Sequence, residues 1–120
     1  MYDFNELKVE NNESEEILER FKSKYINESY PERILLINHL NRIDRKISID
    51  KIRELNVPSE YTLFMYHERL KILYRTNFES ICLYVEQLEP WEDVDCLVFD
   101  CKLEWFLAIT HNDTLLIYGI

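Results

Sequence analysis

The stretch that decides the fold is VDCLVFDCKLEWFLAITHNDTLLIYGI, residues 94–120. It contains three apolar segments rich in aromatic and β-branched residues: 94–100, 104–110 and 114–120. Short polar connections separate these segments, and the second connection contains Asn112 and Asp113, which are common turn residues. The pattern predicts three antiparallel strands that follow one another as a β-meander.

Helical periodicity dominates the residues before this run. Apolar stripes and capping residues predict helices over four segments: 14–25, 29–47, 48–56 and 76–89. In the last of these, Thr76 and Glu79 have the spacing of a capping box, and Pro90 ends the helix. Segment 61–75 fits either a buried strand or a buried helix, and the aromatic residues near 61–66 favour the strand.

Helices followed by a meander indicate an α+β fold. We expect a single domain, residues 1–120, in which N-terminal helices pack on a small C-terminal antiparallel β-sheet. A chain of this length that is 47% hydrophobic can bury a core without metal or disulfide support.

The composition argues against most enzyme classes. Gly119 is the single glycine, whereas average usage of about 7% would give roughly eight. Phosphate-binding loops, dinucleotide fingerprints and nucleophile elbows need glycine where the backbone turns sharply or approaches a ligand. No metal-ligand spacing is present, so we expect no metal, no cofactor and no catalytic residues. The three cysteines, Cys82, Cys96 and Cys101, stand among apolar residues and are interpreted as small buried hydrophobic groups.

The net charge of −9 bears on the choice of partner. Such a chain repels phosphate backbones, which disfavours nucleic acid, and a basic protein is its natural complement. Solubility alone is the alternative explanation of the charge. No apolar run approaches the roughly 18 residues of a membrane span, and the N-terminal residues do not form a signal peptide. We therefore expect a cytoplasmic location and no membrane contact.

Acidic residues and two tryptophans gather between residues 86 and 104. Acids beside a large aromatic ring are typical of an interface, where charge steers association and the ring anchors it. The candidate partner-binding residues are Glu89, Trp91, Glu92, Asp93, Asp95, Asp100 and Glu104. The alternative is that the acids solvate a sheet edge while Trp105 belongs to the core.

Two further motifs contain histidine. The run YHERL, residues 66–70, places His67 beside Glu68 and Arg69, and His111 begins the turn before the last segment. Either histidine can in principle serve acid–base chemistry with a nearby carboxylate. The simpler interpretation is a solvated bend with local ion pairing for the first motif and a turn for the second.

Residues 89–120, with Trp91, Asp93 and Asp95 followed by VFD, Trp105 and AITHND, resemble a motif of small acidic bacterial immunity proteins. These proteins belong to contact-dependent growth inhibition and other polymorphic toxin systems. The resemblance implies a protein that catalyses nothing and neutralises one cognate toxin domain, often a nuclease with a basic groove. The alternative function is a non-catalytic interaction or regulatory module with no toxin partner.

Overall fold

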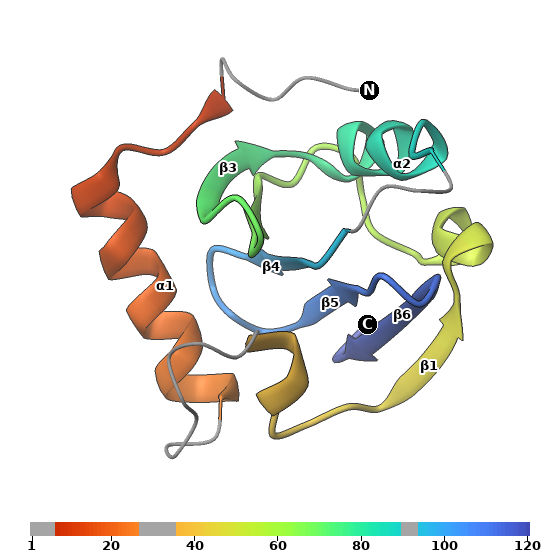
Figure 1. Ribbon diagram of the computed structural model, residues 1–120, viewed down its shortest axis with the longest axis horizontal. Coiled ribbons are helices and arrows are strands. Elements are labelled where there is room, and N and C mark those ends of the chain that lie inside the picture. The colour runs from red at the N-terminus through yellow and green to blue at the C-terminus, as the bar shows by residue number, and fades with distance from the viewer. Residues whose placement is uncertain (1–6, 27–35, 90–93) are drawn as a thin grey trace.

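A six-stranded sheet lies at the centre of the protein, whose computed structural model describes residues 7–26, 36–89 and 94–120 (Figure 1). The strands are β1 (Arg45–Ser48), β2 (Leu63–His67), β3 (Ile72–Thr76), β4 (Cys96–Asp100), β5 (Phe106–Ile109) and β6 (Thr114–Tyr118). They are ordered β1-β6-β5-β4-β2-β3, and every neighbouring pair is antiparallel. With the helices described below, the fold is mixed α+β.

The three consecutive antiparallel strands predicted for residues 94–120 are present, but they belong to a six-stranded sheet and not to a small separate C-terminal one. Strands β4, β5 and β6 are consecutive neighbours, with Val98 opposite Leu107 and Leu107 opposite Ile117. The chain turns between β5 and β6, where Asp113 has a positive φ of 58°. Aspartate tolerates this left-handed conformation better than most residues, which explains its place in the turn.

The prediction of a helix over residues 29–47 is wrong in its C-terminal part, and its beginning lies outside the described residues. Only a short 3₁₀ helix, η2 (Leu36–His39), forms there, and the chain then continues into β1. Strand β1 pairs with β6, placing Ile47 opposite Leu115. The free edge of the meander supplies a full set of backbone partners, and this tertiary pairing overrides a weak local helical preference.

Segment 61–75 forms a hairpin, so the strand interpretation is confirmed. Strands β2 and β3 are joined by a turn in which Lys71 has a positive φ of 57°. Helix α2 (Phe78–Glu86) follows, and its N-terminus differs from the predicted capping box. The side chain of Asn77, rather than that of Thr76, accepts a hydrogen bond from the Ser80 N–H at 2.9 Å. Predicted helix 48–56 is a 3₁₀ helix, η3 (Ile49–Glu54).

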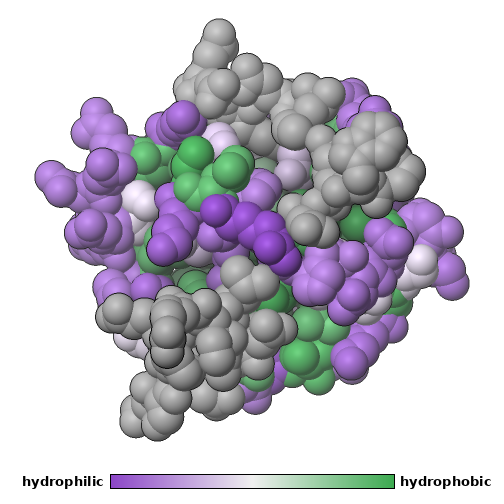
Figure 2. Space-filling model, in the orientation of Figure 1, coloured by the Kyte–Doolittle hydropathy of each residue, from purple (hydrophilic) through white to green (hydrophobic). Residues whose placement is uncertain are grey.

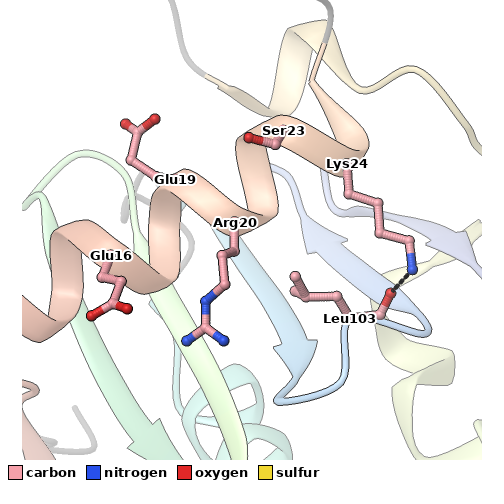
Figure 3. A pocket seen from close by; sticks show the side chains of 6 residues that line it. All are labelled: Glu16, Glu19, Arg20, Ser23, Lys24 and Leu103. Atoms are coloured by element: carbon pink, nitrogen blue, oxygen red, sulfur yellow. Dashed lines mark hydrogen bonds between the residues drawn. The ribbon is translucent and has the colours of Figure 1, made fainter.

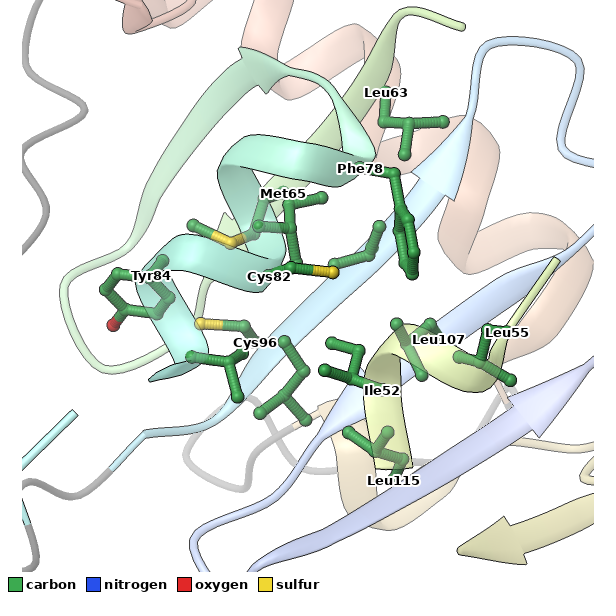
Figure 4. Packing of buried hydrophobic residues seen from close by; sticks show 14 of the residues in the cluster. Ile52, Leu55, Leu63, Met65, Phe78, Cys82, Tyr84, Cys96, Leu107 and Leu115 are labelled. Carbon is green, nitrogen blue, oxygen red and sulfur yellow. The ribbon is translucent and has the colours of Figure 1, made fainter. Parts of the chain in front are cut away.

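Both faces of the sheet are covered at its centre, which explains why the central strands β4 and β5 are apolar and buried along almost their whole length. On one face, helix α1 (Asn11–Tyr25) packs through Phe21 and Tyr25. The Phe21 and Phe99 rings are 4.7 Å apart between centroids, and those of Tyr25 and Phe106 are 4.9 Å apart. On the other face, α2 and η3 cover a second core that includes Ile52 (Figure 4). Helical elements therefore flank the sheet on both sides, an arrangement that the sequence did not predict.

Candidate functional site

The structure separates the acidic residues that the sequence groups together. Trp91, Glu92 and Asp93 lie outside the described residues. Glu89 is exposed beyond α2, and Asp95 immediately precedes β4. Asp100 and Glu104 lie at the other end of β4, at its turn into β5. Because β4 has five residues that each rise about 3.3 Å, its two ends are roughly 15 Å apart. Among the described residues, the predicted group is therefore divided between the two ends of β4 and the segment after α2.

Asp95 is not available as the exposed contact residue that the sequence suggests. Its side chain is 0% exposed. Oδ2 accepts a hydrogen bond of 2.8 Å from Nε of Arg69, and Oδ1 lies 2.9 Å from Nδ1 of His111. The His111 backbone N–H also donates to Oδ1, at 3.2 Å. Buried carboxylates are paired in this way because an isolated buried charge is costly, and the pairing closes Asp95 to a partner protein.

The turn between β4 and β5 has a well-defined conformation. Oδ1 of Asp100 accepts hydrogen bonds from the backbone N–H groups of Glu104, at 2.9 Å, and Trp105, at 3.4 Å. Leu103 has a positive φ of 56°, and its N–H donates to the Asp100 carbonyl at 3.1 Å. Asp100 therefore holds the turn, while the Glu104 side chain is exposed on it.

Helix α1 fixes the tip of this turn from the side. The Leu103 carbonyl accepts hydrogen bonds from Nζ of Lys24, at 2.6 Å, and from the hydroxyl of Tyr25. Burial, followed by the nearby Tyr118, raises the pKa of Tyr25, which keeps its hydroxyl protonated as the donor. The turn is thus anchored to α1 by two hydrogen bonds. In general, a surface that is already ordered in this way loses less entropy on binding.

Within the described residues, three surface hollows that adjoin this turn can be defined. The first, about 760 Å³ and shallow, lies between the outer face of α1 and Leu103 (Figure 3). The second, about 140 Å³, lies between α1 and residues 99–103. The third, about 380 Å³, is enclosed by the turn and by Tyr61 and Thr62, which precede β2. We call this region, the turn residues 100–105 with the lining of the three hollows, the turn surface.

The lining of the turn surface contains more acids than bases, and two of these acids, Glu13 and Glu19, pair with Arg75 and Lys22 outside the lining. Its charged lining residues are five acids and three bases: Glu13, Glu16, Glu19, Asp100, Glu104, Arg20, Lys24 and Lys102. Hydrophilic residues also dominate the neighbouring side of the molecule, over α1 (Figure 2). The charge of this surface is therefore more complementary to a basic protein than to an anionic ligand.

Sequence reasoning identified Asp100 and Glu104 on this surface but missed Tyr61, Lys24 and Leu103. Tyr61 gives one available signal, because it is an aromatic residue directly after the segment Pro58–Ser59–Glu60. Leu103 gives none, because its backbone carbonyl is the group that matters. Lys24 gives no signal either, since the carbonyl group that it contacts is 79 residues away in sequence.

The two histidine motifs meet at the opposite end of the sheet. Arg69 and His111 both contact Asp95, as described above, and the Glu68 N–H donates to the Asp95 carbonyl at 2.9 Å. The Glu68 carboxylate is buried and accepts N–H hydrogen bonds from Leu36 and Ile37. Burial raises the pKa of Glu68 to about 7. We call Glu68, Arg69, Asp95 and His111 the polar cluster.

These contacts show what the polar cluster can do. They join four parts of the chain: the β2–β3 turn, the start of β4, the β5–β6 turn and the η2 segment. The role of the polar cluster that these contacts support is therefore structural. His67 lies beside the cluster, where burial lowers its pKa below the usual value and Nδ1 accepts the Leu70 N–H at 3.3 Å. A neutral imidazole is suited to that acceptor role.

The cysteines only partly follow the prediction. Cys82 and Cys96 are buried, and burial raises the pKa of the Cys82 thiol to about 11, which makes it unreactive. Cys101 is exposed in the β4–β5 turn, contrary to the prediction of burial. Within the described residues no group of three potential metal ligands is found. The helices in the same residues are too short or too polar to cross a membrane.

Comparisons with protein-family models, curated proteins and solved structures found no match to this chain.

Proposed function

We propose that this protein binds and neutralises a basic protein domain through the turn surface, without catalysing a reaction. The observation that carries the proposal is the convergence of three hollows on one preorganised acidic turn. Association sites combine shape, charge and limited mobility in this way, since immobilising a flexible loop would consume binding free energy.

The resemblance to immunity proteins supplies the class of partner. On this proposal the partner is a cognate toxin domain, and a nuclease fits best because its substrate groove is basic. The net charge of −9 would accelerate encounter, with an association rate on the order of 10⁸ M⁻¹s⁻¹ at low salt. An interface of about 1,600 Å² would provide a stable complex. Exposed Glu89 lies outside the turn surface and remains a candidate contact.

Calorimetry tests the proposal directly, using this chain and the C-terminal domain of the protein encoded immediately upstream. We expect one-to-one binding with a nanomolar dissociation constant that weakens as salt increases. Glu104→Lys should weaken binding at least tenfold, because it places like charges opposite each other. Glu54→Lys is the matched control, since Glu54 is an exposed acid in η3 that lines none of the three hollows.

Two results would contradict the proposal in different ways. Equal losses from the two reversals would mean that net charge, and not the turn surface, controls binding. Tight binding of a protein without toxin activity would instead favour the interaction-module alternative, in which the same surface serves a regulatory partner.

A further inference from the structure

The hollow between Tyr61 and the β4–β5 turn has features that specify its occupant. Its volume is about 380 Å³, near the lower end of ligand pockets. Tyr61 and Trp105 are the aromatic residues of its lining, which also includes the exposed residue Glu104. Hollows of this size and composition receive a single side chain of a partner more readily than a large cofactor.

The exposure of Tyr61 is unusual for this protein. Among the described residues, four large hydrophobic side chains are strongly exposed, and Tyr61, at 51%, is the aromatic one. Trp105 is half-buried and packs against the core beneath the sheet, which holds its ring in place. One ring is thus free to cover a ligand, while the other forms a fixed wall.

Carboxylates complete the lining. Asp100 uses Oδ1 to hold the turn, as described above, whereas Glu104 has no salt-bridge partner within the described residues. Lys102 is the one base in this lining, so the two acids leave a net charge of −1. The hollow therefore combines aromatic faces with an acidic rim.

We propose that this hollow binds an arginine side chain of the partner protein. A guanidinium group stacks on aromatic faces and pairs with a carboxylate through two parallel N–H donors, whereas an ammonium group does neither as well. Tyr61 and Trp105 would contact the guanidinium plane, and Glu104 would accept its N–H hydrogen bonds. This inference rests on the proposed function, because it names the residue type through which a basic partner is recognised.

Gly119 contributes to the shape of this hollow from behind. A Cβ atom at this position would lie 2.7 Å from the Glu104 carbonyl oxygen and 3.0 Å from Cβ of Trp105. Glycine therefore lets the C-terminal backbone pack closely behind the two lining residues. The Gly119 N–H is held by Oδ2 of Asp44 at 3.0 Å, so this support is itself fixed.

A titration monitored by NMR tests the occupant without requiring the partner. The ¹⁵N-labelled protein is titrated with N-acetyl-arginine amide, and the Trp105 indole N–H, assigned with Trp91→Phe, is the reporter. We expect saturable shifts at millimolar ligand. The neutral isostere N-acetyl-citrulline amide should cause none, and N-acetyl-lysine amide should bind more weakly.

Variants locate the binding. Tyr61→Ala and Glu104→Gln should each weaken arginine binding about two- to fivefold, the range of a cation–π contact or an exposed ion pair. Glu60→Gln is the matched control, because it removes the same charge beside Tyr61 from an exposed residue that does not line the hollow. Equal effects of the two glutamine variants would overturn the assignment.

The outcomes separate this inference from the proposed function. Equal shifts with citrulline or equal affinity for lysine would overturn the arginine assignment. Absence of arginine binding, with tight binding of the toxin domain by calorimetry, would overturn the inference and leave the proposed function standing. If arginine binding depends on Tyr61 and Glu104 but no toxin partner binds, the hollow would still be assigned as an arginine site. The proposal of a toxin partner would then be contradicted.

Discussion

Asp95 and His111 bring together two parts of the chain that are 16 residues apart in sequence, with Oδ1 of Asp95 2.9 Å from Nδ1 of His111. Arg69, from a third segment, pairs with the same carboxylate at 2.8 Å. Asp95 is fully buried, whereas Arg69 and His111 are 39% and 40% exposed. The pairing therefore holds two surface turns against the start of β4. We expect its loss to lower the stability of the fold more than the affinity for a partner.

Asp95→Asn should lower the free energy of unfolding by about 1–3 kcal/mol. The change removes hydrogen bonds to a charged acceptor, and the partial exposure of Arg69 limits the loss. Urea denaturation provides the measurement. Asp113→Asn is the matched control, because Asp113 is exposed and asparagine also tolerates its positive φ. If Asp95→Asn lowered the free energy of unfolding no more than this control does, the pairing would make no measurable contribution to stability.

Glu68 should make stability depend on pH. Its folded-state pKa, about 7, lies above the ordinary value of 4.5 because the carboxyl is buried. The folded protein therefore binds the proton more tightly than the unfolded chain does. The resulting stabilisation, up to about 3 kcal/mol, is complete below pH 4.5 and is lost as pH rises through about 7.

Glu68→Gln isolates this effect. Glutamine keeps an oxygen that can accept the Leu36 and Ile37 N–H groups but does not titrate. Between pH 5 and 8, urea denaturation should show the stability of the native protein falling relative to that of the variant. His67, whose lowered pKa acts with the opposite sign, is present in both proteins and largely cancels. Parallel pH profiles would contradict the raised pKa of Glu68.

The elements predictable from the sequence are those with a strong local signal. The apolar stripe predicted for the helix over 14–25 consists of Ile17, Leu18, Phe21 and Tyr25, and α1 buries all of them except Leu18, which is half-buried. The three C-terminal apolar segments likewise correspond to three consecutive strands. Both signals come from side-chain periodicity, which is sufficient when one face of a helix or both faces of a strand are buried. Strand β1 had no such signal, because only Ile47 within it is even half-buried.

The site was less predictable because it depends on contacts between distant residues. An acidic residue is usually exposed, but Asp95 is buried because Arg69 and His111 provide hydrogen-bond partners for its carboxylate. The anchoring of Leu103 by Lys24 and Tyr25 joins residues 78 and 79 positions apart. Charge counts along a sequence identify an acidic protein, but only the fold decides which carboxylates reach the surface.

Asn77→Ala should destabilise the protein by about 1 kcal/mol. The Asn77 side chain caps α2 by accepting the Ser80 N–H, and removing a cap of this type usually costs that amount. Thr76→Val provides the comparison, because Thr76 is buried and its hydroxyl has no hydrogen-bond partner in the described structure. We expect that change to be neutral or slightly stabilising in thermal denaturation. If Thr76→Val lowered the stability more than Asn77→Ala does, the result would support Thr76 as the capping residue, as predicted from the sequence.

Gly119→Ala should lower the stability of the fold and change the conformation of the turn surface. Gly119 has a φ of 85°, and an L residue in a left-handed conformation costs about 1–2 kcal/mol. The added Cβ would also meet the Glu104 carbonyl oxygen at 2.7 Å, so the backbone of the turn must move. We therefore expect a loss of at least 1 kcal/mol in urea denaturation, together with a shifted Trp105 indole signal.

Gly119→Asn separates the two causes, because asparagine accepts positive φ better than alanine but carries the same Cβ. If the contact with Glu104 dominates, the two variants should lose similar stability and shift the Trp105 signal alike. If backbone conformation dominates, Gly119→Asn should recover most of the loss. An unshifted Trp105 signal in both variants would show that the C-terminal backbone does not support the turn surface, since the contact that joins them would then have no consequence.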